Sequence, residues 1–119
     1  MQEFQIEFYE KIDGTEPAKD FILSLDTKMR AKVLRTVSLL GDSGPTLREI
    51  YSKPLDDGIF EIRTKFGSDI TRVLYFFVVG KKVILTNGFI KKSQKTPQAE
   101  IELAKKYRAE YLSRKENSQ

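Results

Sequence analysis

Residues 58–90 read GIFEIRTKFGSDITRVLYFFVVGKKVILTNGFI, and this stretch decides the fold. Apolar and polar side chains alternate over residues 59–66, which is typical of a strand with one exposed face. Residues 71–79 are apolar at almost every position, which indicates a strand covered on both faces. Residues 83–90 form a third strand, and glycine-containing turns separate the three. Strands joined by tight turns pair antiparallel, so the stretch predicts a three-stranded meander whose middle strand is central.

The residues before the meander predict one further strand and two helices. Residues 5–8 alternate as a short strand does. Thr15-Glu16-Pro17 is typical of a helix start with Thr15 as the cap, and Asp26 can cap a second helix that Gly41 can end. The apolar stripes of the two helices are Ala18, Phe21, Ile22 and Leu25, and then Met29, Val33, Val37 and Leu40. We expect residues 42–57 to be mostly loop, ending in a turn at Asp56-Asp57-Gly58.

The residues after the meander predict a basic loop and a final helix. Gly88, inside the third strand, indicates a bulge or a close backbone approach. Residues 91–95 form the loop, and Thr96-Pro97 is typical of a helix start, again with a hydroxyl cap. The inner stripe of this helix is Ile101, Ala104, Tyr107, Arg108 and Tyr111. Residues 1–119 therefore predict a single two-layer α+β domain, with an N-terminal strand and helix hairpin packed on an antiparallel meander sheet and a C-terminal helix.

The composition excludes several kinds of active site. The chain has no histidine and no cysteine, which removes histidine-based catalysis, thiolate nucleophiles and the usual zinc ligands. Asp56 and Asp57 have no third acid close in sequence, so we expect neither a metal ion nor another cofactor. The longest apolar run, residues 73–79, is far shorter than the roughly 20 residues of a membrane helix. The N-terminus also lacks the start of a signal peptide, so we expect a cytoplasmic protein without membrane contact.

Positive charge is concentrated at the C-terminal end. Residues 1–80 hold 11 lysine and arginine residues against 13 aspartate and glutamate residues, a net charge of −2. Residues 81–119 hold 10 against 4, a net charge of +6. This distribution is typical of a protein that binds a polyanion, and equally of a solvated basic helix and tail.

One face of the predicted sheet gathers candidate functional residues. Glu61, Arg63 and Lys65 alternate with apolar residues along the first strand of the meander, so they share a face, and Arg63 should point away from the core. Arg72 heads an otherwise apolar neighbouring strand, where an arginine needs a partner or a function. The lysines of the basic loop leave the third strand on the same side; they are Lys91, Lys92 and Lys95. The alternative is an ordinary solvated face with cross-strand charge pairs.

Three stretches match a known family. They are Gly58–Arg63, Arg72–Phe77 and Gly88–Pro97, the last of which has the pattern GFxKKxxKTP. In this order and spacing the chain resembles, over nearly its whole length, the phage-derived HigB-like branch of the RelE/ParE toxin superfamily. The resemblance implies a RelE-like fold and a single toxin domain over residues 1–119.

The resemblance also implies a function and partners. Such proteins are toxins of type II toxin–antitoxin systems, and they typically enter the ribosome and cut messenger RNA. The RNA 2′-hydroxyl attacks the adjacent phosphate without a metal ion. The expected partner is a HigA-like helix-turn-helix antitoxin, with which the toxin can form a hetero-oligomer.

The candidate residues fit that chemistry. Charge on the phosphate oxygens calls for guanidinium groups, for which Arg63 and Arg72 are the candidates. The general base could be Glu61 or a lysine of the 91–95 loop, and the acid could be a lysine or one of the tyrosines Tyr51, Tyr107 and Tyr111. We therefore expect catalytic roles for Glu61, Arg63, Arg72, Lys92 and Lys95, and RNA binding by Lys53, Lys65 and Lys91. The alternatives are a nucleic-acid-binding module that does not cleave and a protein that has kept the fold but lost activity.

Overall fold

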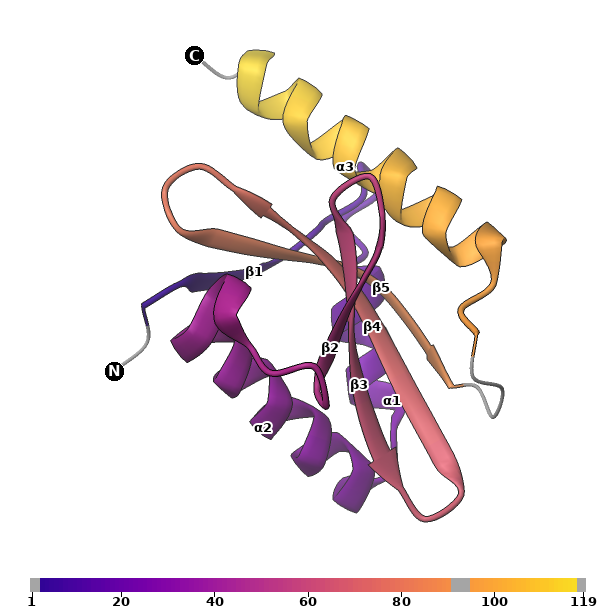
Figure 1. Ribbon diagram of the computed structural model, residues 1–119. Coiled ribbons are helices and arrows are strands. Elements are labelled where there is room, and N and C mark those ends of the chain that lie inside the picture. The colour runs from indigo at the N-terminus through magenta and orange to yellow at the C-terminus, as the bar shows by residue number, and fades with distance from the viewer. Residues whose placement is uncertain (1–2, 91–94, 118–119) are drawn as a thin grey trace.

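A five-stranded sheet organises the molecule, which the computed structural model describes over residues 3–90 and 95–117 (Figure 1). The fold is α+β, as the sequence predicts. The elements in chain order are β1 (Gln5–Phe8), α1 (Pro17–Ser24), α2 (Thr27–Ser43), the short 3₁₀ helix η1 (Gly44–Thr46), β2 (Ser52–Asp56), β3 (Ile59–Phe66), β4 (Asp69–Val78), β5 (Lys82–Ile90) and α3 (Gln98–Asn117).

The strands lie in the order β1-β5-β4-β3-β2. β3, β4 and β5 pair antiparallel, which confirms the predicted meander. β4 is the central strand, and its residues 71–76 are all buried, as expected for a strand covered on both faces. β1 pairs parallel with β5, so the whole sheet is mixed and not purely antiparallel.

β2 is a strand that the sequence analysis assigned to a loop. It pairs antiparallel with β3, and the two-residue turn Asp57-Gly58 joins the two strands. Both turn residues have positive φ, 49° and 79°, which is the backbone of a tight hairpin turn. Pro54 argued against a strand, but β2 lies at the edge of the sheet, where a residue without an N–H is tolerated.

Helices cover both faces of the sheet (Figure 1). The α1–α2 hairpin packs its apolar stripes on one face, against β-sheet residues that include Ile62, Val73 and Leu85, as predicted. α3 adds a layer on the other face, where Ala104, Tyr107 and Tyr111 meet side chains of the sheet. Each face of the sheet thus has its own apolar core, and α3 lies over the face that carries Glu61 and Arg63.

The helix ends show which local signals held. Asp26 caps α2 as predicted, because its side chain accepts a hydrogen bond from the Met29 N–H. The predicted cap Thr15 is wrong: Glu16 occupies that position, and the Thr15 hydroxyl donates to Asp13 instead. Gly41 does not end α2, which continues to Ser43. The helix stops at Gly44, whose φ of 55° suits glycine.

Gly88 marks a close approach, the second of the two features that its position in a strand predicts. The β4–β5 register does shift between Leu74 and Tyr75, but the extra residue of this bulge is Thr86, and Gly88 itself pairs with Val73. A Cβ atom at Gly88 would lie 2.4 Å from the Phe21 ring and 3.2 Å from the Arg72 carbonyl oxygen. The missing side chain therefore allows α1 to pack closely on β5.

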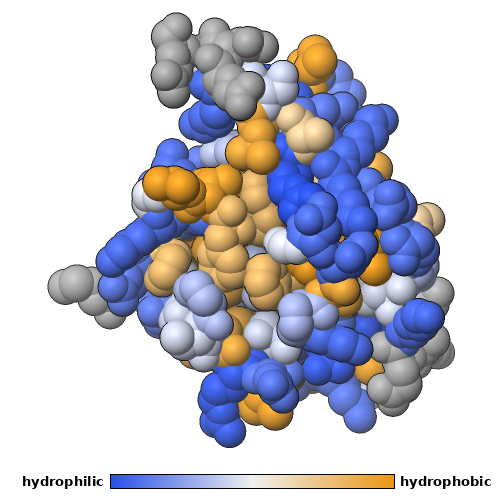
Figure 2. Space-filling model, turned by 45° about the horizontal axis from the view of Figure 1, so that its top comes forward, coloured by the Kyte–Doolittle hydropathy of each residue, from blue (hydrophilic) through white to orange (hydrophobic). Residues whose placement is uncertain are grey.

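The surface is mostly hydrophilic, with an apolar area in the middle of one face (Figure 2). Half-buried aromatic rings line the edge of the core on the α1–α2 side, where Phe77 contacts both Phe4 and Phe60 edge-on. None of the helices in the described part of the chain has the length and apolar composition needed to cross a bilayer.

Candidate functional site

Strand pairing gathers the predicted site residues on the α3 face of the sheet. Arg63 of β3 lies directly opposite Arg72 of β4, and Lys53 of β2 lies directly opposite Glu61 of β3. Directly opposed residues project to the same face, so these four side chains share one side. Two arginines opposite each other repel, which means that the arrangement needs a negative charge between them.

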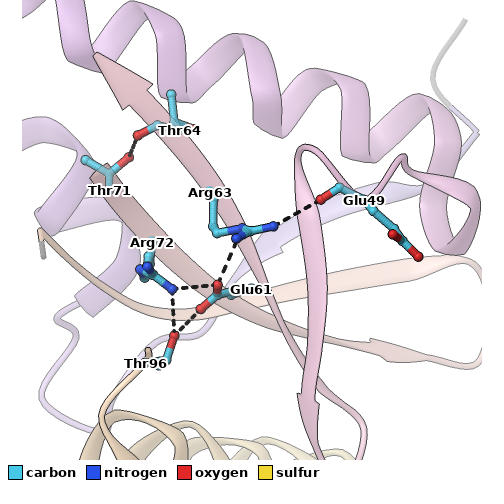
Figure 3. A network of polar contacts seen from close by, with 7 residues as sticks. All are labelled: Glu49, Glu61, Arg63, Thr64, Thr71, Arg72 and Thr96. Atoms are coloured by element: carbon cyan, nitrogen blue, oxygen red, sulfur yellow. Dashed lines mark hydrogen bonds and ion pairs between the residues drawn. The ribbon is translucent and has the colours of Figure 1, made fainter. Parts of the chain in front are cut away.

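Glu61 supplies that negative charge (Figure 3). Its Oε2 lies 2.9 Å from Nη1 of Arg72 and 3.7 Å from Nε of Arg63. Glu61 is 0% exposed and Arg72 is 1% exposed, so this is a buried ion pair. Arg72 thus has the partner that its place in an apolar strand requires, and the three side chains together carry a net charge of +1.

Arg63 differs from its two neighbours because its side chain is 32% exposed. Its Nη2 donates to the backbone carbonyl oxygen of Glu49 at 3.1 Å, on the side away from Glu61 (Figure 3). The guanidinium group is held from two sides and still reaches the surface. Arg63 lies on the face opposite Phe60 and Ile62, as the alternation predicts, but α3 builds a second core on that face, so the side chain is only partly exposed and its Nε is buried.

Thr96 joins the network from the start of α3. Its hydroxyl donates to Oε1 of Glu61 and accepts from Nη1 of Arg72 at 3.1 Å. The prediction that this hydroxyl caps the final helix is therefore wrong; within the first helical turn, the N–H groups of Glu100 and Ile101 donate to the carbonyl oxygen of Pro97. Sequence reasoning missed Thr96 as a site residue because a threonine before a proline is so typical of a helix start.

Two adjoining hollows open beside Arg63. One, of about 350 Å³, is lined by Arg63 and by Glu49, Ser52, Lys53 and Pro54. The second, of about 280 Å³, shares Lys53 and Pro54 with it and runs to Lys95, Thr96 and Gln98 at the start of α3. Asp56 also lines the second hollow, where a 2.5 Å contact with Lys105 lowers the pKa of its carboxyl group. Of the described residues, the two linings together hold three cations, Arg63, Lys53 and Lys95, and two carboxylates, Glu49 and Asp56, so the groove along the edge strand β2 has a net charge of +1.

The predicted lysines fall into three groups. Lys53 and Lys95 are exposed at the groove. Lys65 is exposed on the same strand face as Arg63, two residues nearer the β3–β4 turn. Lys91 and Lys92 lie outside the described residues. Of the segment's described neighbours, Ile90 pairs with Thr71, next to Arg72, and Lys95 adjoins Thr96.

The tyrosines considered as general acids do not line the groove. Tyr107 and Tyr111 are buried in the core beneath α3, and burial raises the pKa of the Tyr111 hydroxyl. Tyr51 is half-buried against the core on the opposite face of the sheet. Glu61 lies beneath the groove with both carboxylate oxygens engaged. The described residues contain no group of three acidic side chains placed to hold a metal ion.

The fold and the site together define an α+β protein with a cationic groove beside an anchored, half-exposed arginine. Residues 20–109, about three quarters of the chain, match the family model of the Gp49-like phage-derived proteins (DUF891). The chain belongs to this family, which is part of the RelE/HigB-like toxins of toxin–antitoxin systems. No curated protein matches the chain significantly.

Proposed function

We propose that this protein is the toxin of a type II toxin–antitoxin system and acts in the cytoplasm as a ribosome-dependent messenger-RNA endoribonuclease. The observation that supports this most directly is Arg63, a half-exposed guanidinium group fixed by Glu61 and Glu49 at the edge of a cationic groove. A fixed cation of this kind is suited to a phosphate on which negative charge develops.

In the proposed reaction, the RNA 2′-hydroxyl attacks the neighbouring phosphorus and the bond to the 5′ oxygen breaks. The products are a 2′,3′-cyclic phosphate and a 5′-hydroxyl end. Arg63 stabilises the charge on the non-bridging oxygens, and Arg72 holds Glu61 in place beneath it. No metal ion is required, because the guanidinium charge and proton transfer by side chains carry the step.

The remaining roles follow from position. Lys53 and Lys95 contact the RNA backbone along the groove, and Lys65 extends the same positive face. The general base is one of Glu61, Lys92 and Lys95, and Lys91 binds RNA. Since Glu61 is buried and fully engaged, Lys95, which is exposed at the groove, is the better placed of the two described candidates for proton transfer.

The proposed partner is a HigA-like helix-turn-helix antitoxin that forms a hetero-oligomer with the toxin. The net charge of +6 in residues 81–119 suits an acidic segment of such a partner, and the same charge would draw RNA. Binding of the antitoxin over the groove would block RNA by direct competition.

The experiment is to add the purified protein to a reconstituted translation reaction and to map new 5′ ends on the messenger RNA. The wild type should cut on translating ribosomes, and Arg63→Ala should cut about 10²–10³ times more slowly. Arg35→Ala is the matched control, because Arg35 is an exposed arginine on α2, on the opposite face of the sheet. Uncut messenger at full occupancy of the ribosome would refute the proposal.

The burial of Glu61 favours one alternative, a nucleic-acid-binding module that uses the same groove without cleaving. Both Glu61 oxygens are engaged, and neither Tyr107 nor Tyr111 reaches the groove. In the translation experiment, a protein of this kind would shift RNA mobility at every condition and yield no new 5′ ends.

A further inference from the structure

The hydroxyl group of Thr96 is placed where it can control the site without touching a substrate. Thr96 is 5% exposed and lies directly before the turn that starts α3. Its hydroxyl hydrogen-bonds two side chains of the sheet: it donates to Oε1 of Glu61 and accepts from Nη1 of Arg72. A threonine at a helix start usually serves its own helix, so this use of the hydroxyl calls for an explanation.

Glu61 has little freedom once Thr96 is in place. Thr96 holds Oε1, while Arg72 at 2.9 Å and Arg63 at 3.7 Å share Oε2. With both oxygens engaged, the plane of the carboxylate is fixed. Rotation of the carboxylate would change the distance from Oε2 to Nε of Arg63.

Arg63 in turn takes its position from Glu61. Nε faces Oε2 of Glu61, and Nη2 donates to the carbonyl oxygen of Glu49 at 3.1 Å. Among the described residues, Nη1 of Arg63 makes no hydrogen bond, and the side chain lines the larger hollow. On its inner side the guanidinium group is held by the 3.7 Å ion pair with Glu61 alone, because the buried Nε makes no hydrogen bond to any described residue, and its outer side is available.

We infer that Thr96 is a positioning residue: through Glu61 it sets the orientation of the Arg63 guanidinium toward the phosphate of the bound RNA. This inference rests on the proposed function. The same anchor fixes the backbone next to Lys95, so one hydroxyl sets both the arginine and the lysine at the end of the groove. Small displacements of such groups have large effects on rate, up to about 10²-fold for about 1 Å.

The test compares Thr96→Val with Thr96→Ser. Valine keeps the shape and removes the hydroxyl, whereas serine keeps the hydroxyl and loses only a methyl group. The rates are compared at a temperature where circular dichroism shows both variants to be folded. Thr96→Val should cleave about 10- to 100-fold more slowly than the wild type, and Thr96→Ser should keep most of the wild-type rate. Thr71→Val is the matched control, because it removes another buried hydroxyl, which bonds the Thr64 carbonyl oxygen and not Glu61.

A second measurement separates positioning from mere stabilisation. If Thr96 acts through Arg63, then Thr96→Val should slow cleavage no further in a protein that already carries Arg63→Ala. Losses that multiply in the double variant would overturn the inference and leave the proposed function standing, as would a Thr96→Val protein that cleaves at the wild-type rate. Should Thr96→Val fail to fold, Thr96→Ala, which also removes the hydroxyl group, takes its place in the same comparison. A wild-type protein that cuts no RNA refutes the proposed function and this inference together.

Discussion

Arg72→Met tests the buried ion pair that underlies the site. Methionine has a similar length and no charge, so the change removes the guanidinium group and keeps most of the packing. Arg72 and Glu61 are 1% and 0% exposed, so Glu61 would keep its charge in a buried place with one strong partner fewer. Breaking such a pair from one side costs about 3–5 kcal/mol. The loss of stability in Arg72→Met should lie at the lower end of this range, because the Thr96 hydroxyl and the more distant Arg63 still contact Glu61.

The double variant Glu61→Leu/Arg72→Met separates the charge from the packing. Without the acid, no buried charge is left unpaired, and replacing a whole buried pair by apolar residues is often neutral or stabilising. The double variant should therefore be more stable than the single one, by about 2 kcal/mol or more. It should nevertheless be inactive, because Arg63 loses the carboxylate that orients it.

Urea unfolding of the wild type and the two variants measures these free energies. The m-values should agree, since the surface exposed on unfolding hardly changes. A domain of this size has about 5–15 kcal/mol of stability, so the single variant stays folded in buffer. A loss below about 1 kcal/mol in Arg72→Met, or a double variant less stable than the single one, would refute the account of Glu61 as a buried charge that needs Arg72.

Four further expectations concern the site and the core. Arg63→Ala should lower the free energy of unfolding by only about 1–2 kcal/mol in the same urea assay, because it removes one exposed hydrogen bond and one long ion pair. Arg63→Lys should cleave faster than Arg63→Ala and more slowly than the wild type. EDTA should leave cleavage of a model RNA intact; a loss that Mg²⁺ or Mn²⁺ alone restores would contradict the metal-free reaction. Burial raises the pKa of Tyr75 to about 12, so between pH 10 and 12 the unfolded state loses this proton and the folded state keeps it. The free energy of unfolding, measured by pH-jump unfolding, should therefore fall over this range, and it should fall less steeply in Tyr75→Phe. Gly88→Ala should lower the free energy of unfolding, measured by thermal melting, by about 1–3 kcal/mol, because the added methyl group meets the ring of Phe21. An unchanged melting temperature would show that Phe21 moves aside freely.

The fold was predictable where periodicity was strong. The apolar run of β4 and the stripes of α1 and α2 identify buried surfaces directly, because buried positions are occupied by apolar residues at a regular spacing. Strand β2 was not predictable, since Pro54 and a polar edge position weaken the signal of a strand. The Asp57-Gly58 dipeptide was the available clue, because Asp-Gly between two strands is a strong hairpin signal.

The site was predictable in part. Alternation along β3 correctly puts Glu61 and Arg63 on one face, but it reads that face as exposed. α3 covers Glu61, and no local pattern in β3 reveals a helix that arrives more than 30 residues later. The contact between Thr96 and Glu61 spans 35 residues, so it depends on tertiary packing that sequence periodicity does not record.

The position of α3 therefore decides what the charged face of the sheet can do. Its start is tied to the sheet by Thr96 and by Asn87, whose side-chain amide donates to Glu100 at 3.0 Å. Further along, Arg108 binds Asp57 at 2.8 Å, at the turn between β2 and β3. With α3 held in this place, Glu61 and Arg72 are buried, and Arg63 is the member of the ion network that stays partly exposed. Because the buried pair fixes Arg63, its positive charge needs little reorganisation to meet a phosphate, which is the condition under which a single cation stabilises a transition state most effectively.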